Sequence, residues 1–150
     1  MLAAAAAAAA FAPVAAAAAP AGPVQIGDPP SGKALIVFFR RWEYAGFVLS
    51  YIVREGQAEL GVLGAGNYFV ATVDPGLHTY STHAERRDDM QIQVEADEIY
   101  YVVFEMDMGL FLYQPTLVPT EQRLFDELSP RLKLSEPVTG PKQAIAPTAP

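Results

Sequence analysis

The chain has 150 residues, enough for one domain with a sizeable core, and its composition excludes several classes of function. It contains no cysteine, which excludes disulfides, thiol catalysis and thiolate metal sites. The net charge is −7 and the ten Lys and Arg residues are scattered along the chain, so nucleic acid is not an expected partner.

The N-terminal segment has the character of a secretion signal. Of the first 22 residues 15 are Ala, and no Lys or Arg occurs before Lys33. A signal peptide combines a basic start, an apolar stretch and small residues at the cleavage site, and only the basic start is missing here. We expect residues 1–21 to be cleaved before Gly22, which makes the mature protein periplasmic or secreted, without a stable membrane anchor. An uncleaved membrane helix, weakened by two internal prolines, and a leader without a targeting role are the alternatives.

A linker and a buried strand follow the leader. Residues 22–31 are rich in Pro and Gly with one charge, which is typical of a linker. The domain is expected to occupy residues 32–134. It begins with residues 33–40, which are apolar on both alternating faces and therefore predict a strand buried on both sides.

Two further strands are expected at residues 47–53 and 57–63. Glu55-Gly56 between them is a signal for a tight hairpin turn. Gly61 interrupts the second of these strands, which predicts a β-bulge or a close approach of another group.

The stretch GNYFVATVDPGLHTYS suggests a hairpin. Residues 67–73 and 77–82 both alternate as strands do. Asp74–Gly76 separates them, and a Pro followed by a Gly fits the two central positions of a type II turn. We expect the two strands to pair with each other.

Three more strands are predicted at residues 90–95, 98–106 and 110–113. A short helix should follow with Thr120 as its N-cap, and Ser129-Pro130 should end it. Its apolar side, Leu124, Phe125 and Leu128, can cover one sheet face. Residues 135–150 are rich in Pro and Ala and are expected to be a disordered tail.

These elements predict an all-β fold, an antiparallel β-sandwich of about seven or eight strands with one short C-terminal helix. Their short length and roughly regular spacing, with a turn signal after each strand, favour this architecture. A closed β-barrel is the alternative.

No enzyme chemistry is predicted, and neither a metal nor a cofactor is expected. His78 and His83 are the only histidines, and on one strand an odd separation places them on opposite faces, where they cannot share a metal. No serine sits in a nucleophile elbow and no glycine-rich loop leads into a helix with a Lys. The preferred role of His78 is a structural hydrogen bond beside Tyr80, which lies on the same face; ligand contact is the alternative.

The aromatic loop after the first strand is the strongest candidate for a binding surface. Trp42 and Tyr44 lie beside Arg40 and Arg41, and exposed aromatic and Arg residues are enriched at protein interfaces. Packing of these residues on their own sheet is the other possibility. The candidate interface or ligand-contacting residues are Arg40, Trp42, Tyr44, Tyr68, His78 and Tyr80.

Three stretches together resemble a family of small bacterial envelope proteins known only as a domain of unknown function, DUF2846. They are GKALIVFFRRWEYAGFVLSYIV, ELGVLGAGNYFVATVDPGLHTYS and VEADEIYYVVFEMDMG. The shared pattern is the pair Phe39-Arg40, a Gly before Tyr68-Phe69, and the turn Pro75-Gly76-x-His78.

The resemblance covers about residues 33–128 and implies an exported, sandwich-like domain with no established activity and no catalytic residues to transfer. Members of the family are often lipoproteins, which need a cysteine that this chain lacks. The expected function is that of a noncatalytic module that binds an envelope protein or itself. A small-ligand or carbohydrate site near His78 and Tyr80 is the alternative.

Overall fold

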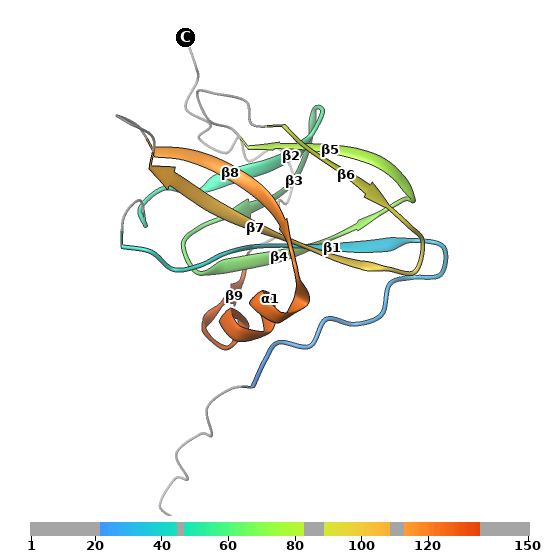
Figure 1. The fold of residues 1–150 in the computed structure, drawn as a ribbon, viewed down its shortest axis with the longest axis horizontal. Helices are drawn as coiled ribbons and strands as arrows, with labels where there is room; N and C mark the ends of the chain where they lie inside the picture. Colours follow the sequence, from blue (N-terminus) through green and yellow to red (C-terminus); the bar gives the residue numbers. More distant parts are fainter. Residues whose placement is uncertain (1–21, 45–46, 83–88, 109–112, 136–150) are drawn as a thin grey trace, which may run out of the picture.

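The structure is a computed structural model that describes residues 22–44, 47–82, 89–108 and 113–135. In these ranges the chain forms two β-sheets packed face to face, with one short helix on the outer side (Figure 1). The predicted all-β sandwich is confirmed, and the described residues contain nine strands. The predicted leader, the tail from residue 136 onward, His83 and most of the strand predicted at residues 110–113 lie outside the described ranges.

Two sheets make up the sandwich. Sheet A has the strand order β8 (Tyr113–Thr120), β7 (Ile99–Met108), β1 (Ala34–Arg40), β4 (Asn67–Val73), β9 (Lys133–Leu134). Sheet B has the order β3 (Ala58–Leu63), β2 (Tyr51–Glu55), β5 (Gly76–Thr82), β6 (Met90–Val94). Neighbouring strands are mostly antiparallel, but β1 runs parallel to β7 and β4 runs parallel to β9. The sequence does not predict β9, because a strand of two residues has no alternating pattern.

Strand β1 lies at the centre of sheet A, and all seven of its residues are buried, as its two apolar faces predict. One face points into the main core between the sheets. There the ring of Phe38 stacks on Phe69 with centroids 5.0 Å apart and meets the edge of Tyr80 at 5.2 Å. The other face, with Val37 and Phe39, belongs to a second core.

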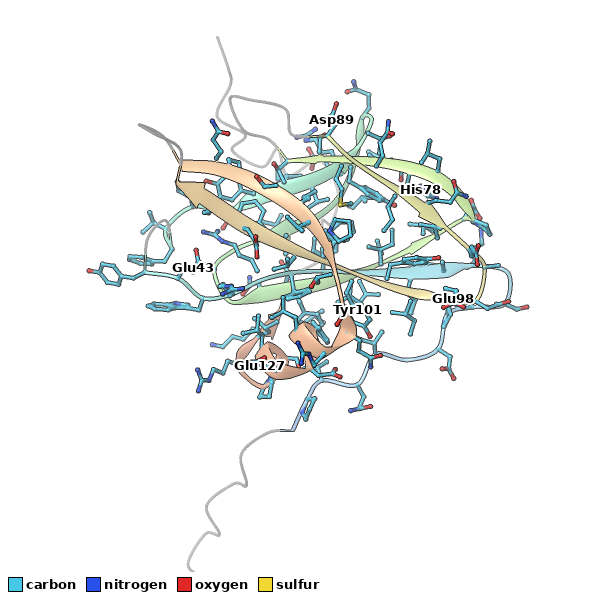
Figure 2. The ribbon with its side chains drawn as sticks, in the orientation of Figure 1. Glu43, His78, Asp89, Glu98, Tyr101 and Glu127 are labelled. Atoms are coloured by element: carbon cyan, nitrogen blue, oxygen red, sulfur yellow. The ribbon has the colours of Figure 1, made fainter. Side chains whose placement is uncertain are left out.

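The second core lies between sheet A and helix α1 (Gln122–Leu128). Phe125 is fully buried at its centre, with its ring centroid 5.3 Å from Phe39, 5.6 Å from Tyr68 and 5.5 Å from Tyr101. Figure 2 labels Tyr101 on the side of sheet A that faces the helix. The prediction that the apolar side of this helix covers one sheet face is therefore confirmed.

The prediction that Thr120 caps this helix is wrong. Thr120 is the last residue of β8 and pairs with Tyr101, which holds its backbone in the sheet. The N-cap position falls on Glu121, whose side chain makes no capping hydrogen bond. The helix ends at Leu128, and a 3₁₀ turn, η1 (Ser129–Arg131), follows at the predicted Ser-Pro stop.

Residues 22–31 form neither helix nor strand, yet they follow the surface of the domain. Val24 and Ile26 pack against the second core. The backbone N–H of Val24 donates to Ser129 Oγ at 2.9 Å. This segment therefore adds apolar cover to the outer face of sheet A, beside the helix.

The predicted pairing of residues 67–73 with 77–82 is wrong. Strand β4 pairs with β1 along its length and with β9 at Asn67 and Tyr68, and it forms no ladder with β5. The chain instead crosses at Asp74–Gly76 into sheet B, where β5 pairs with β2 and β6. Gly76 has a φ of 136°, which a residue with a side chain rarely adopts.

Strand β2 begins later than predicted, at Tyr51 instead of residue 47. Tyr51 pairs with Leu63, the last residue of β3, and the chain turns away at Gly64. Residues 47–50 therefore have no strand opposite them, and a strand without a partner is not stable in water.

The two glycine predictions in this hairpin are confirmed. Glu55 pairs with Ala58, and Gly56 between them has a φ of 58°, as the first loop residue of a type II′ turn requires. The register shifts after Val53, which marks a bulge. A Cβ on Gly61 would lie 2.7 Å from the ring of Phe69, so the ring occupies the space that only glycine leaves open.

Candidate functional site

The segment between β1 and β2 exposes a cluster of large apolar side chains. Its members are Trp42, Tyr44, Phe47, Val48 and Leu49, which are 62, 79, 49, 74 and 50% exposed. We call these five residues the Trp42 loop. The rings of Tyr44 and Phe47 lie 5.8 Å apart, and the other three side chains belong to the same short segment. Large apolar residues are common on surfaces singly, whereas several together are a feature of interaction sites, so this loop is a candidate.

A buried arginine fixes the base of the Trp42 loop. The guanidinium of Arg40, at the end of β1, is nearly inaccessible and donates from Nη1 to the carbonyl of Leu49 at 2.7 Å. Its Cζ also lies 5.4 Å from the ring centroid of Tyr51 and 5.1 Å from that of Phe104. Burial has the largest effect and leaves the pKa of Arg40 below its usual value, although the charges of Tyr51 and Glu43 raise it. Arg40 thus ties both ends of the loop to the core and is not itself a contact surface.

Trp42 also rests on the sandwich. A Cβ on Gly66 would lie 3.4 Å from Trp42 Cβ, so the first part of this side chain packs on the backbone of Gly66. The φ of Gly66 is 75°, a second reason for glycine at this position. The remainder of the indole is exposed, which leaves an anchored aromatic side chain available to a partner.

The charges beside the Trp42 loop nearly cancel. Arg41 lies 3.8 Å from Glu43 and 3.9 Å from Glu105 in exposed ion pairs. Exposed pairs of this kind contribute little to stability. The loop therefore presents mainly apolar contact area, with no strong field of either sign.

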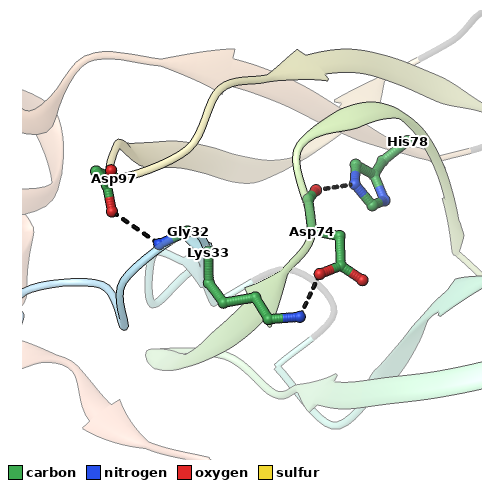
Figure 3. A network of polar contacts seen from close by, with 5 residues as sticks. All are labelled: Gly32, Lys33, Asp74, His78 and Asp97. Carbon is green, nitrogen blue, oxygen red and sulfur yellow. Dashed lines mark hydrogen bonds and ion pairs between the residues drawn. The ribbon is translucent and has the colours of Figure 1, made fainter.

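His78 is held by two acceptors at the point where the chain crosses between the sheets. Its Nδ1 lies 2.5 Å from Glu55 Oε1, and its Nε2 lies 2.6 Å from the carbonyl of Asp74. Figure 3 shows the contact with Asp74, whose carboxylate also pairs with Lys33. A neutral imidazole has one N–H, so only the protonated ring donates to both acceptors.

Several effects act on the pKa of His78. Burial is the largest single one and lowers it. The hydrogen bonds to the Asp74 carbonyl and the Glu55 carboxylate, with the charges of both residues, outweigh burial and raise the pKa above its ordinary 6.5. Lys33 lowers the pKa of Asp74, mainly through their hydrogen bond. The cluster therefore favours an imidazolium between the Glu55 carboxylate and the backbone carbonyl of Asp74.

Tyr80 completes this part of the core. Its ring is parallel to that of His78, with centroids 5.9 Å apart, and its side chain is fully buried. Within the described residues its hydroxyl has no hydrogen-bond partner. Burial, followed by the charge of Glu55, raises the pKa of Tyr80. The expected structural hydrogen bond of His78 beside an aromatic ring matches this geometry.

The six candidate residues therefore fall into three places. Trp42 and Tyr44 belong to the Trp42 loop, with Arg40 buried beneath it at the end of β1, and His78 and Tyr80 stack on β5. Tyr68 lies elsewhere, against Phe125 in the second core.

Two features of these places do not follow from the local sequence pattern. Phe47, Val48 and Leu49 fall within a predicted strand, and the signal against that strand is the early turn at Gly64, which leaves them without a strand opposite. No local signal could identify Glu55 as a partner of His78, since the pairing depends on the sheet order.

Comparison of the chain with known protein families, curated proteins and solved structures found no match. The resemblance to the envelope family therefore stays a prediction. In the described ranges no group of three or more acidic or histidine side chains is placed to hold a metal ion. Helices long and apolar enough to span a bilayer are also absent from those ranges.

Proposed function

We propose that this protein is an exported, noncatalytic β-sandwich that binds another protein of the bacterial envelope through the Trp42 loop. The observation that carries the proposal is the exposure of five large apolar side chains on one segment with a fixed base. Burying one such side chain fully contributes about 1.5–3 kcal/mol. A partner that covers several of them gains enough free energy for a specific complex.

The anchoring of the loop strengthens the proposal. Association loses free energy when it must order flexible side chains and loops. Here Arg40 and Gly66 already hold the two ends of the loop against the core. Trp and Tyr also dominate the centres of protein interfaces, because they bury a large area and have few rotatable bonds.

Export rests on the Ala-rich character of residues 1–21, which fits a signal peptide. The net charge of −7 does not favour binding to anionic lipid or to nucleic acid. The near cancellation of charge beside the Trp42 loop favours a partner surface that is apolar, with a polar rim.

The alternative ligand site at His78 and Tyr80 has less support. Both ring nitrogens of His78 already contact acceptors of the protein itself. Tyr80 is fully buried in the main core. Neither side chain is presented to a ligand from solution.

The proposal is tested by a matched pair of surface variants. Trp42→Ala with Val48→Ser removes two exposed anchors, while Leu77→Ala removes an apolar side chain of similar exposure on β5. Each tagged protein is crosslinked in cells of the source bacterium, and the captured proteins are identified by mass spectrometry.

We expect one envelope protein to be captured with the natural chain and with Leu77→Ala, and to be lost with the double variant. The melting temperatures of all three proteins should agree within a few degrees, because the changed side chains are exposed. Equal capture by all three would refute the proposal. Binding of the purified chain to phosphatidylcholine vesicles, lost in the double variant and without a protein partner, would also refute it.

A further inference from the structure

The two sheets have four edge strands, β8 and β9 in sheet A and β3 and β6 in sheet B. An edge strand exposes unpaired backbone N–H and C=O groups that can pair with another chain. Natural proteins protect such edges with prolines, charges, bulges, very short strands or covering segments. The four edges of this protein differ in that respect.

Three of the four edges are protected. Strand β8 contains Pro115 and Pro119, which have no N–H to offer a ladder. Strand β9 has only two residues. Strand β3 carries a charge at Glu59 and a bulge next to Gly61, and the hydroxyl of Ser135 donates to its carbonyl at Val62.

Among the residues that the structure describes, strand β6 has none of these devices. Its sequence, MQIQV, contains no proline, glycine or charge. In the described ranges β6 pairs only with β5. Strand β8 of sheet A comes close to β6 but does not pair with it. Met90 and Val94 are buried while Gln91 and Gln93 are exposed, so β6 has the regular alternation that a further strand can continue.

The charges at the ends of β6 indicate the kind of strand that fits. Asp89 precedes it and Glu95 follows it, and both are exposed. Asp97 and Glu98 follow in the turn that leads to β7, where Figure 2 labels Glu98, while Asp89 is labelled at the start of β6. A second copy of β6, paired antiparallel over all five residues, would place Asp89 opposite Glu95 at both ends. Like charges in that position are destabilising, which disfavours self-pairing.

We propose that β6 is a docking edge for an extended segment of another protein, with alternating apolar residues and a basic residue at each end. Addition of such a strand to sheet B provides main-chain hydrogen bonds, and the alternate side chains and terminal charges provide selectivity. The segment is taken to run antiparallel to β6, the direction in which β6 itself pairs with β5, so one defined edge of the segment faces β6. This surface is separate from the Trp42 loop and does not depend on the function proposed for it.

The test uses three synthetic peptides with blocked ends. The basic peptide is Lys-Val-Thr-Val-Thr-Val-Lys, whose lysines have the spacing of Asp89 and Glu95 and whose valines match the buried face of β6. The acidic control replaces both lysines by glutamate. The backbone control consists of two forms of the basic peptide. In each form every second residue is N-methylated, which blocks the N–H groups along one of the two edges of the extended peptide.

Binding is measured by NMR titration of the folded protein at low salt, following the backbone amides of Met90–Val94. The basic peptide should shift these amides and bind about tenfold or more tightly than the acidic one, since two cross-strand charge pairs change sign. One N-methylated form should bind and the other should not, because only one edge of the peptide pairs with β6. The variant Asp89→Lys with Glu95→Lys should reverse the charge preference, and circular dichroism should show that it remains folded.

Other outcomes would overturn the proposal. They are absence of shifts at β6, equal binding of both N-methylated forms, and an unchanged preference in the charge-reversed variant. Dimerisation of the protein through β6 itself would overturn it as well.

Discussion

Replacing His78 by Ala should destabilise the protein in a way that depends on pH. The change removes the contacts of the ring with the Glu55 carboxylate and the Asp74 carbonyl, and its stacking on Tyr80. A hydrogen bond that involves a charged group contributes about 1.5–3 kcal/mol. Glu55 is about a third exposed, so solvent weakens its part. We therefore expect a total loss of about 2 kcal/mol when the ring is protonated.

The sign of the pH dependence follows from the raised pKa of His78. The folded protein holds this proton more tightly than the unfolded chain does. The contribution to stability is therefore fully present below the unfolded pKa of about 6.5, and it is lost as pH rises through the folded pKa. The difference between the natural protein and His78→Ala should shrink over that window.

The assay is urea unfolding of both proteins from about pH 5.5 to about pH 9. His83 is present in both proteins, so its titration cancels in the difference. Leu77→Ala, a change at a neighbouring exposed position, is the control and should have little effect at any pH. A loss that stays constant across the range, or no loss at low pH, would refute the assignment of a protonated ring between two acceptors.

Three further changes test the packing of the two cores, each by thermal or urea unfolding. Gly61→Ala should lower the free energy of unfolding by about 1–3 kcal/mol, because its Cβ meets the ring of Phe69. Gly27→Ala, with open space around it, should change this free energy little. Equal effects of the two changes would contradict the close packing. Phe125→Ala should lose about 3–5 kcal/mol by opening a cavity in the second core, and a loss under about 1 kcal/mol would show that this core adds little. Tyr80→Phe should leave stability unchanged or raise it by up to about 1 kcal/mol, because it removes a buried hydroxyl that has no partner within the described residues. A clear loss would mean that this hydroxyl is hydrogen-bonded.

Local patterns in the sequence were sufficient to predict most strands and the fold class. The two apolar faces of β1 predict burial on both sides, because each face alternates with period two along the strand. Gly56 and Gly61 predict a turn and a close approach, because glycine adopts a positive φ without strain and leaves space that a side chain would fill. Leu124, Phe125 and Leu128 predict the covered face of the helix by their spacing.

One error concerns β8, which runs over Tyr113–Thr120 where a strand is predicted only over residues 110–113. The other errors concern which strand pairs with which. The turn at Pro75-Gly76 favours a hairpin locally, but the chain crosses there to sheet B, where β5 pairs with β2 and β6. The early end of β3 likewise leaves Phe47 to Leu49 without a partner and exposes them. Both outcomes depend on contacts between segments distant in sequence, which local patterns do not encode. The partners of His78 were missed for the same reason.

The central claim is that the Trp42 loop contacts a protein partner, and site-specific photo-crosslinking in living cells tests it most directly. A benzophenone side chain is placed at Tyr44 in one protein and at Leu77 in another, two positions that are both well exposed. The proposed function predicts that irradiation links one envelope protein to position 44 and that this protein is not linked to position 77. The same protein linked equally at both positions, or no protein linked to position 44, would contradict it.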